Sequence, residues 1–135
     1  MDILNPLAEQ YCTQFSSDQD VLLQEIEAHT NQHHGHAHML SGKWQGKFLE
    51  MISMMINPTK VLEIGSFTGF SALCLSKGLT KDGHLHTIEI REEDAKTAQQ
   101  FFEPLFQFFD QQIPTMMIYN HFKMNPRKNP HTKTG

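Results

Sequence analysis

Cysteine is scarce in this sequence, and the two that occur lie far apart. The distance along the chain between Cys12 and Cys74 excludes the closely spaced cysteines of thiolate zinc sites and redox pairs. We therefore expect both residues to be buried free thiols.

A long apolar run is also missing. No stretch of about 18 apolar residues could span a bilayer, and the first residues, among them Asp2, Asn5 and Glu9, lack the basic start and apolar stretch of a signal peptide. We expect a cytoplasmic protein without a membrane partner. Its 135 residues, 39% of them hydrophobic, fall in the range of a single domain with one core.

Acidic residues are absent from the C-terminal end, where the last one is Asp110. Residues 120–135 instead contain four cationic side chains: Lys123, Arg127, Lys128 and Lys133. A basic segment can hold phosphate, but one this short, with no aromatic residue besides Phe122, is typical of a solvated chain end. We expect no nucleic-acid partner, a divergent and disordered basic tail over residues 111–135, and no packing of residues 120–135.

The N-terminal part has apolar residues at helical spacing, which predicts two short helices in residues 1–30 that cover a face of the core. A dense group of histidines follows around Gly35: His33, His34, His36 and His38. Neutral imidazole is a common ligand of zinc, copper and nickel, but the glycine and the lack of a nearby Cys or Asp favour a loop. We assign residues 1–40 to a helical cover with a His-rich loop, assign no metal ligand, and leave the role of the histidines open.

The pattern then changes from helical to alternating elements. A helix is predicted from Ser41 to the stop at Asn57-Pro58, a short buried strand over residues 60–64, a helix over residues 71–77, and a second strand over residues 84–90. The order strand, helix, strand predicts two adjacent parallel strands joined by a right-handed crossover. The fold class is therefore α/β with a parallel, doubly wound sheet.

Two glycines and two carboxylates surround the turn after the first strand. Gly65 and Gly69 bracket this turn, where a missing side chain lets the backbone bend sharply and approach a ligand. Glu89 ends the second strand beside the turn, and its carboxylate can accept both hydroxyls of an adenosine ribose. Together with Glu63, just before the turn, this arrangement predicts a nucleoside site.

The loop favours S-adenosylmethionine over NAD as the nucleoside cofactor. It reads G-x-x-x-G, with Phe67 in the middle and no nearby Lys or Arg, whereas a dinucleotide site uses G-x-G-x-x-G to bring its backbone to a pyrophosphate. Glu63 would repel a pyrophosphate and suit an ammonium or sulfonium group. An NAD-binding enzyme is kept as the less favoured alternative.

Three segments between His38 and Phe102 resemble one family closely: "HMLSGKWQGKFLEMI", "VLEIGSFTGFSALCLSKGL" and "GHLHTIEI". They resemble the cation-dependent caffeoyl-CoA and catechol O-methyltransferases, over about half of this chain. The resemblance implies a Rossmann-like fold with a seven-stranded sheet, S-adenosylmethionine as cofactor, and a hydroxylated aromatic small molecule as methyl acceptor. Residues 41–110 would then form the βαβ half-domain that binds S-adenosylmethionine.

By match to the family's motifs, the resemblance also implies cofactor-binding residues. Met39 and Ser41 would lie against the methionine portion, Glu63 and Gly65 at the loop, Ser71 at the cofactor's carboxylate, and Glu89 on the ribose.

The chain departs from the family beyond Phe102. Family members bind a divalent cation, Mg or Ca, through Asp and Asn residues at the ends of later strands, but here no acidic residue follows Asp110, and the Gly-Asp pair that usually begins the adenine-side segment is missing as well. Pro104 is expected to break the helix that should precede the third strand. We expect a truncated or frame-shifted product whose catalytic residues are unknown.

Two classes of function follow. The first is an O-methyltransferase by descent, inactive if its catalytic half is missing. The second is a non-catalytic cofactor-binding remnant or interaction protein. Half a parallel sheet leaves an exposed edge and an uncovered apolar face, which predicts a homo-oligomer formed through that edge.

Overall fold

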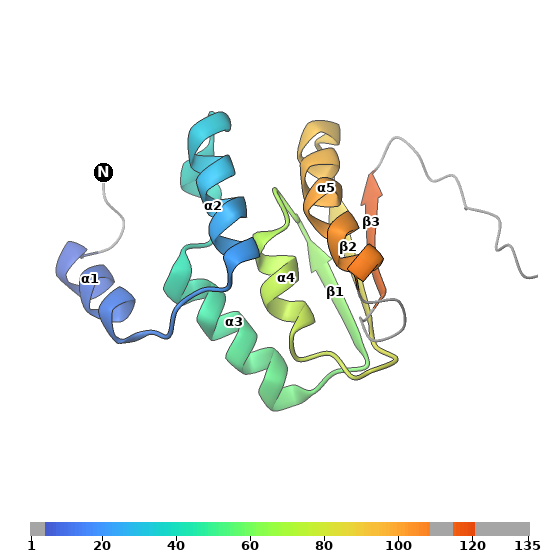
Figure 1. Ribbon diagram of the computed structural model, residues 1–135, viewed down its shortest axis with the longest axis horizontal. Coiled ribbons are helices and arrows are strands. Elements are labelled where there is room, and N and C mark those ends of the chain that lie inside the picture. The colour runs from blue at the N-terminus through green and yellow to red at the C-terminus, as the bar shows by residue number, and fades with distance from the viewer. Residues whose placement is uncertain (1–4, 109–114, 121–135) are drawn as a thin grey trace, which may run out of the picture.

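The computed structural model describes residues 5–108 and 115–120, in which a helical N-terminal part precedes alternating strands and helices (Figure 1). The elements in chain order are α1 (Pro6–Phe15), α2 (Val21–His33), the short 3-10 helix η1 (Ala37–Met39), α3 (Lys43–Ile56), β1 (Lys60–Ile64), α4 (Phe70–Ser76), β2 (His84–Glu89), α5 (Glu92–Phe108) and β3 (Thr115–Asn120).

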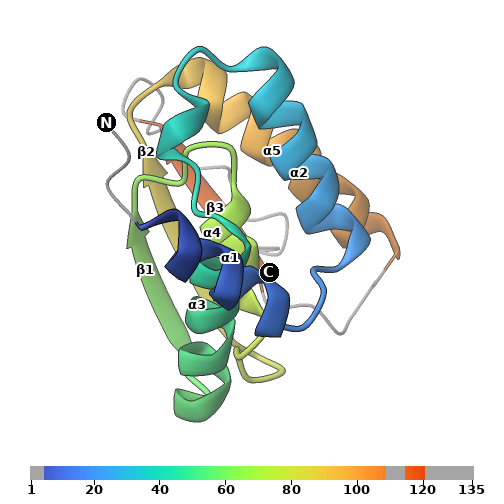
Figure 2. The same cartoon turned by 90° about the vertical axis from the view of Figure 1, so that its left-hand side faces the viewer.

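The strands form one parallel sheet in the order β1-β2-β3. Lys60 of β1 pairs with His84 of β2, which pairs in turn with Thr115 of β3. The predicted pair of adjacent parallel strands with a crossover helix is therefore confirmed. Helices α2, α4 and α5 lie on the same side of the sheet (Figure 2).

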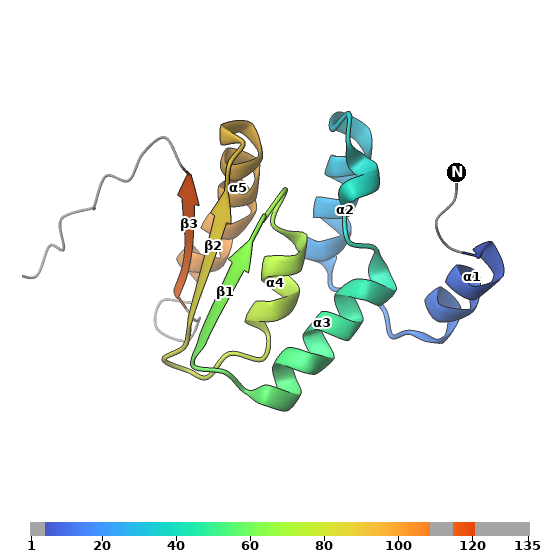
Figure 3. The ribbon, with the colours of Figure 1, turned by 180° about the vertical axis from the view of Figure 1, so that it is seen from behind.

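Side-chain caps begin the two N-terminal helices. Asn5 accepts the backbone N–H of Leu7 at 3.0 Å, and Asp20 accepts that of Leu23 at 2.9 Å. Helix α2 then buries an apolar stripe in the core, as expected. Helix α1 has no buried residue and lies beside α3, away from the sheet (Figure 3). The expected N-terminal cover therefore consists of α2, because the segment between the helices carries α1 away from the core.

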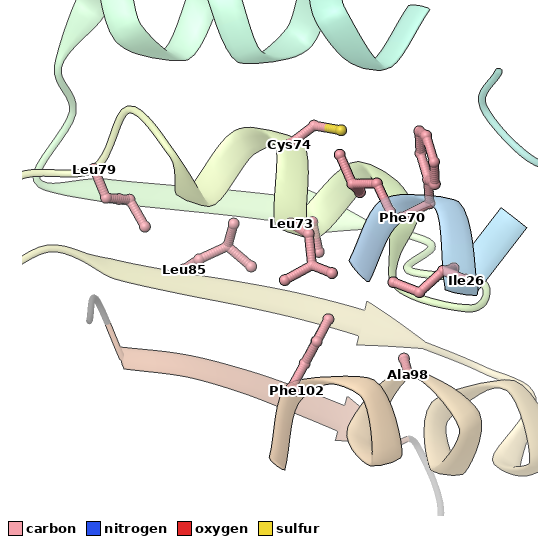
Figure 4. Packing of buried hydrophobic residues seen from close by; sticks show 10 residues of the cluster. Ile26, Phe70, Leu73, Cys74, Leu79, Leu85, Ala98 and Phe102 are labelled. Atoms are coloured by element: carbon pink, nitrogen blue, oxygen red, sulfur yellow. The ribbon is translucent and has the colours of Figure 1, made fainter. Parts of the chain in front are cut away.

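The core lies between the helices and the covered face of β2. Leu73 of α4, Leu85 of β2 and Phe102 of α5 point into the same space (Figure 4). The remaining buried members of this cluster are Leu23, Ile26, Phe70, Ala72, Cys74, Leu79 and Ala98.

The two cysteines differ in environment. Cys74 is buried, and burial raises the pKa of its thiol to about 12. Cys12 is exposed, so the prediction of a buried thiol was wrong there. The reason is that α1, which carries Cys12, contributes nothing to the core.

The C-terminal part differs from expectation in two places. Helix α5 continues to Phe108 through Pro104, so the proline does not end it. The preceding turn packs Ala98 and Phe102 into the core, and this packing offsets the roughly 3 kcal/mol that an interior proline costs. The expected disordered tail over residues 111–135 also begins too early, because Thr115–Asn120 forms β3 on the edge of β2. Residues 121–135, which carry the prediction of an unpacked basic end, lie outside the described residues.

One face of the sheet is left open by the described elements. Leu62 and Ile64 of β1 are 66% and 82% exposed, and Ile88 of β2 and Tyr119 of β3 are exposed on the same face. In the part of the chain that the structure describes, β1 also has no neighbour on its outer edge. Within the same residues, no helix is both long and apolar enough to cross a membrane.

Candidate functional site

The loop from β1 to α4 adopts left-handed backbone conformations at three positions. The φ angles are +90° at Gly65, +48° at Phe67 and +95° at Gly69. A Cβ atom at Gly69 would lie 2.8 Å from the Phe102 ring, so this glycine also permits the close approach of α5. A Cβ atom at Gly65 would meet no described heavy atom within 4 Å, so the backbone there borders open space.

Glu89, at the end of β2, is buried and joins this loop to the start of α5. Its Oε2 accepts the backbone N–H of Phe67 at 2.8 Å, and its Oε1 accepts the backbone N–H of Arg91 at 2.9 Å. A carboxylate offers about four acceptor positions. Two therefore remain for further donors, one on each oxygen.

Glu63, on β1, lies on the same covered face of the sheet. The hydroxyls of Ser71 and Thr87 each donate to one of its oxygens at 2.6 Å. Removal from solvent raises the pKa of this carboxyl, the two hydroxyl donors oppose that rise, and the charge of Glu89 adds to it. The two carboxylates thus act on one loop from adjacent strands.

Two threonines tie the loop to α2. The Thr30 hydroxyl donates to the carbonyl of Ile26 at 2.7 Å, so the bond of 2.9 Å between the Thr30 and Thr68 hydroxyls has Thr68 as its donor. Ser66, beside them in the loop, is 1% exposed, and its hydroxyl has no hydrogen-bond partner among the described atoms. The Ser66 hydroxyl therefore remains available for a hydrogen bond to a ligand.

The ring of Phe67 is enclosed by His34 and Arg91. The His34 ring meets it edge-on at 4.5 Å between centroids, and the Arg91 guanidinium lies 5.6 Å from the Phe67 ring centroid. Asp94 links these two residues, because its Oδ1 lies 2.9 Å from His34 Nε2 and its Oδ2 lies 2.7 Å from Arg91 Nε. The loop sequence itself contains no Lys or Arg, but folding brings Arg91 beside it.

These contacts were beyond the reach of sequence patterns. Asp94 and His34 are 60 positions apart, and Thr30 and Thr68 are 38 apart, with no motif connecting either pair. Arg91, directly before α5, and Asp94, in its first turn, are three positions apart, a spacing that predicts an ion pair between them. It does not indicate that the pair reaches the glycine loop.

Met39 and Ser41 flank the site on the N-terminal side. The Met39 thioether is 3.9 Å from Arg91 Nη2, which places this residue beside the Phe67 enclosure. Ser41 is partly buried in the segment before α3. Six residues were expected to bind the cofactor. Of these, Glu63 and Ser71 are joined by a hydrogen bond. Glu89 contacts the loop that begins at Gly65, and Arg91 contacts both Glu89 and Met39.

The His-rich segment borders a cavity of about 680 Å³ next to the start of α5. The cavity is lined by His33, His34, Gly35, His36, Arg91, Glu92, Glu93, Asp94 and Lys96. The segment around Gly35 is a loop, as predicted. Among the described residues there is no cluster of three or more His, Cys, Asp or Glu side chains that could hold a metal ion.

Known proteins match both the sequence and the fold. The family model described as O-methyltransferase matches residues 13–106. A catechol O-methyltransferase of Niastella koreensis is 34% identical over 56 residues, which is 42% of this chain and 25% of that protein.

Two solved structures share the fold: a methyltransferase of Podospora anserina with SAH bound, and an O-methyltransferase of Bacillus cereus in complex with SAH. Their TM-scores are 0.73 and 0.66, at 21% and 25% sequence identity. Each match covers 84% of this chain, and covers 47% and 49% of the respective solved chain. The chain therefore spans about half the length of these proteins, and the predicted Rossmann-like methyltransferase fold is confirmed.

Proposed function

This chain belongs to the O-methyltransferase family, and on that premise we propose that its glycine loop binds S-adenosylmethionine for methyl transfer to a hydroxyl group. The resemblance inferred from the motifs is thereby confirmed at the level of the family, and the NAD-binding alternative is not favoured. We propose a catechol-like aromatic small molecule as the acceptor, in keeping with the catechol O-methyltransferase among its relatives.

The observation that carries the proposal is the geometry of Glu89. Both of its oxygens are already oriented by backbone N–H groups, at 2.8 and 2.9 Å, and each keeps one acceptor position. Two adjacent acceptors at the end of a parallel strand match the two hydroxyls of a ribose. We assign Glu89 to the ribose of the cofactor.

The loop itself fits the rest of a nucleoside cofactor. The open space beside Gly65 allows the backbone to approach a ligand closely, and the buried Ser66 hydroxyl has a hydrogen bond to offer. Glu63 supplies negative charge on the same face, which suits a cationic sulfonium or ammonium group. These features support Glu63 and Gly65 as contacts of the methionine portion.

Three further residues complete the proposed site. Met39 and Ser41 would border the methionine portion from the N-terminal side. Ser71 is assigned to the cofactor's carboxylate, and this role requires its hydroxyl proton to turn away from Glu63, which it now contacts at 2.6 Å. Glu63 would keep the bond from Thr87 in that state.

S-adenosylmethionine supplies a methyl group activated by its sulfonium, which an acceptor oxygen attacks in line. The described residues bind and orient the donor. They provide no cluster that fits the divalent cation expected from the resemblance, so no step of the reaction is assigned to a metal here. We accordingly propose methyl-donor binding as the contribution of this part of the fold.

Calorimetric titration of the full chain with S-adenosylhomocysteine (SAH), the demethylated product of the cofactor, tests the proposal. We expect binding by the wild type and a loss of about 1.5–3 kcal/mol, tenfold or more in affinity, for Glu89→Ala, because two hydroxyls lose their acceptor. Glu89→Asp keeps a carboxylate at the strand end and should lose less. Glu103→Ala removes an exposed carboxylate of α5 and serves as the matched control. Equal affinities of the wild type and Glu89→Ala would refute the ribose assignment.

A further inference from the structure

Phe67 holds a backbone conformation that it does not favour. Its φ of +48° lies in the left-handed region, which is strained for a bulky residue and persists only where the surroundings hold it. The backbone N–H of the same residue donates to Glu89. Whatever holds Phe67 in place therefore also sets the carboxylate assigned to the ribose.

The ring of Phe67 is held from two sides by residues of distant segments. His34 comes from the segment after α2, and Arg91 comes from the turn before α5. Because His34 Nδ1 accepts the backbone N–H of His36 at 3.0 Å, the proton of the neutral imidazole lies on Nε2 and is donated to Asp94. This pair of bonds fixes the plane of the His34 ring.

Asp94 connects the two holders. Its side chain is 4% exposed, and one oxygen takes the His34 proton while the other pairs with Arg91 Nε. The Arg91 contact is an ion pair without hydrogen-bond geometry, and a buried ion pair is screened little by salt. The bond from His34 is strengthened because its acceptor is charged. Each of four residues therefore contacts two of the others. We call this group, His34, Asp94, Arg91 and Phe67, the Phe67 clamp.

We propose that Asp94 is a positioning residue for the methyl-donor loop: through His34 and Arg91 it holds Phe67, and thereby keeps the Glu89 carboxylate oriented. Arg91 takes part twice, since its side chain pairs with Asp94 while its backbone N–H donates to Glu89. The inference rests on the proposed function and assigns a role to His34, one of the histidines that sequence patterns left unexplained.

The clamp acts on affinity by preparing the loop before the cofactor arrives. If the loop is ordered in only a fraction of the free molecules, the measured affinity is the affinity of the ordered form multiplied by that fraction. Asp94→Asn keeps the shape of the side chain, but an amide has only one acceptor oxygen and no charge. It can serve His34 or Arg91, not both.

Two measurements on the full chain test the clamp: calorimetric titration with SAH, and hydrogen exchange of the Phe67 backbone amide in the free protein. For Asp94→Asn we expect affinity to fall about tenfold and the Phe67 amide to exchange faster. Glu92→Gln, the same chemical change two positions earlier in α5 at an exposed site, should alter neither.

A double-mutant cycle separates positioning from general loss of structure. Glycine adopts a φ of +48° without strain, so in a Phe67→Gly background the Asp94→Asn change should lower SAH affinity less than about twofold. Full additivity of the two changes would mean that Asp94 acts elsewhere, and would overturn the proposal.

The outcomes also separate this inference from the proposed function. If the wild type fails to bind SAH, the proposed function fails, while the exchange rate of the Phe67 amide still decides whether the clamp exists. An unchanged exchange rate in Asp94→Asn would overturn the clamp in either case. Faster exchange with unchanged SAH affinity would overturn its role in binding.

Discussion

At the scale of one residue, the position of Glu63 has two opposing effects. Its position on the covered face of β1 brings it to the glycine loop, and the same position removes it from solvent. Loss of solvation raises the pKa of its carboxyl, against the pull of the Ser71 and Thr87 hydroxyls. The charge that suits a cationic ligand is therefore held at a cost to the stability of the free protein.

The cost predicts a pH dependence of unfolding. An acid whose pKa is raised by folding contributes stability that is fully present below its unfolded value of 4.5 and is lost as pH rises through the folded pKa. Glu63→Gln should therefore have a higher free energy of unfolding than the wild type at pH 7, and this advantage should shrink at pH 4. Urea unfolding at both pH values measures it, with Glu103→Gln as the exposed control. An advantage that is equal at both pH values would contradict this account.

The residues whose places beside the loop could be predicted from sequence are those set by position along a strand–loop–helix unit. Gly65 and Glu89 belong to this group, because parallel strands bring their carboxyl ends to one edge. Asp94 and Thr30 do not. Their partners come from segments that only the packing of α2 against the rest of the fold brings close, and no local pattern encodes that packing.

At the scale of elements, α3 and α4 cross at unusually small distance. A Cβ atom at Gly78, just after α4, would lie 2.1 Å from the backbone of Ser53 in α3. A Cβ atom at Gly46 of α3 would lie 2.7 Å from the Phe70 ring of α4. Glycine at these positions lets the two helices meet almost backbone to backbone, and sequence patterns suggested no such contact.

Gly78→Ala should force α3 away from α4, since the atom it meets is backbone and cannot rotate aside. We expect a loss of about 2 kcal/mol or more in the free energy of unfolding. Gly35→Ala, at a position outside the α-helices where a Cβ atom meets no described heavy atom within 4 Å, should change stability by less than about 0.5 kcal/mol. Urea unfolding of both variants gives the comparison, and similar losses in the two would refute the packing argument.

The ends of helices and strands could be predicted where the capping residues and the hydrophobic periodicity indicate the same boundary. They could not be predicted where tertiary packing outweighs the local conformational preference of the residues. Asn57 ends α3, as its place before Pro58 indicates, and its left-handed φ of +49° is one that asparagine tolerates better than most residues. Pro104 argues for a break that α5 does not show. Strand β3 was missed because the segment lacks the motif expected at this point from the resemblance, although Ile118 and Tyr119 have high strand propensity.

At the scale of the whole molecule, one face of the sheet is left uncovered by the elements that the structure describes. Parallel sheets are normally covered on both faces. Here Leu62 and Ile64 stand on the open face of an edge strand that has no outer neighbour among the described residues. Contiguous apolar surface beside an unpaired edge favours association.

We therefore predict that the chain self-associates through this face. In sedimentation velocity, the sedimentation coefficient of the wild type should rise with protein concentration. For Ile64→Lys the rise should be smaller, because a charge must then be buried in the contact. Val21→Lys, which changes an exposed apolar residue of α2 away from the sheet, should behave as the wild type does. A monomeric wild type at all concentrations would exclude the interface.

The order β1-β2-β3 repeats the order of the chain, and this has a kinetic consequence. Each strand pairs with the strand synthesised just before it, across one intervening helix, so no strand has to enter between two that are already paired. At synthesis rates of about 5–20 residues per second, a helix–strand unit leaves the ribosome within seconds and finds its neighbour in place. Folding can therefore proceed in step with translation, growing at the β3 edge, while the outer edge of β1, formed first, gains no partner from the strands that the structure describes.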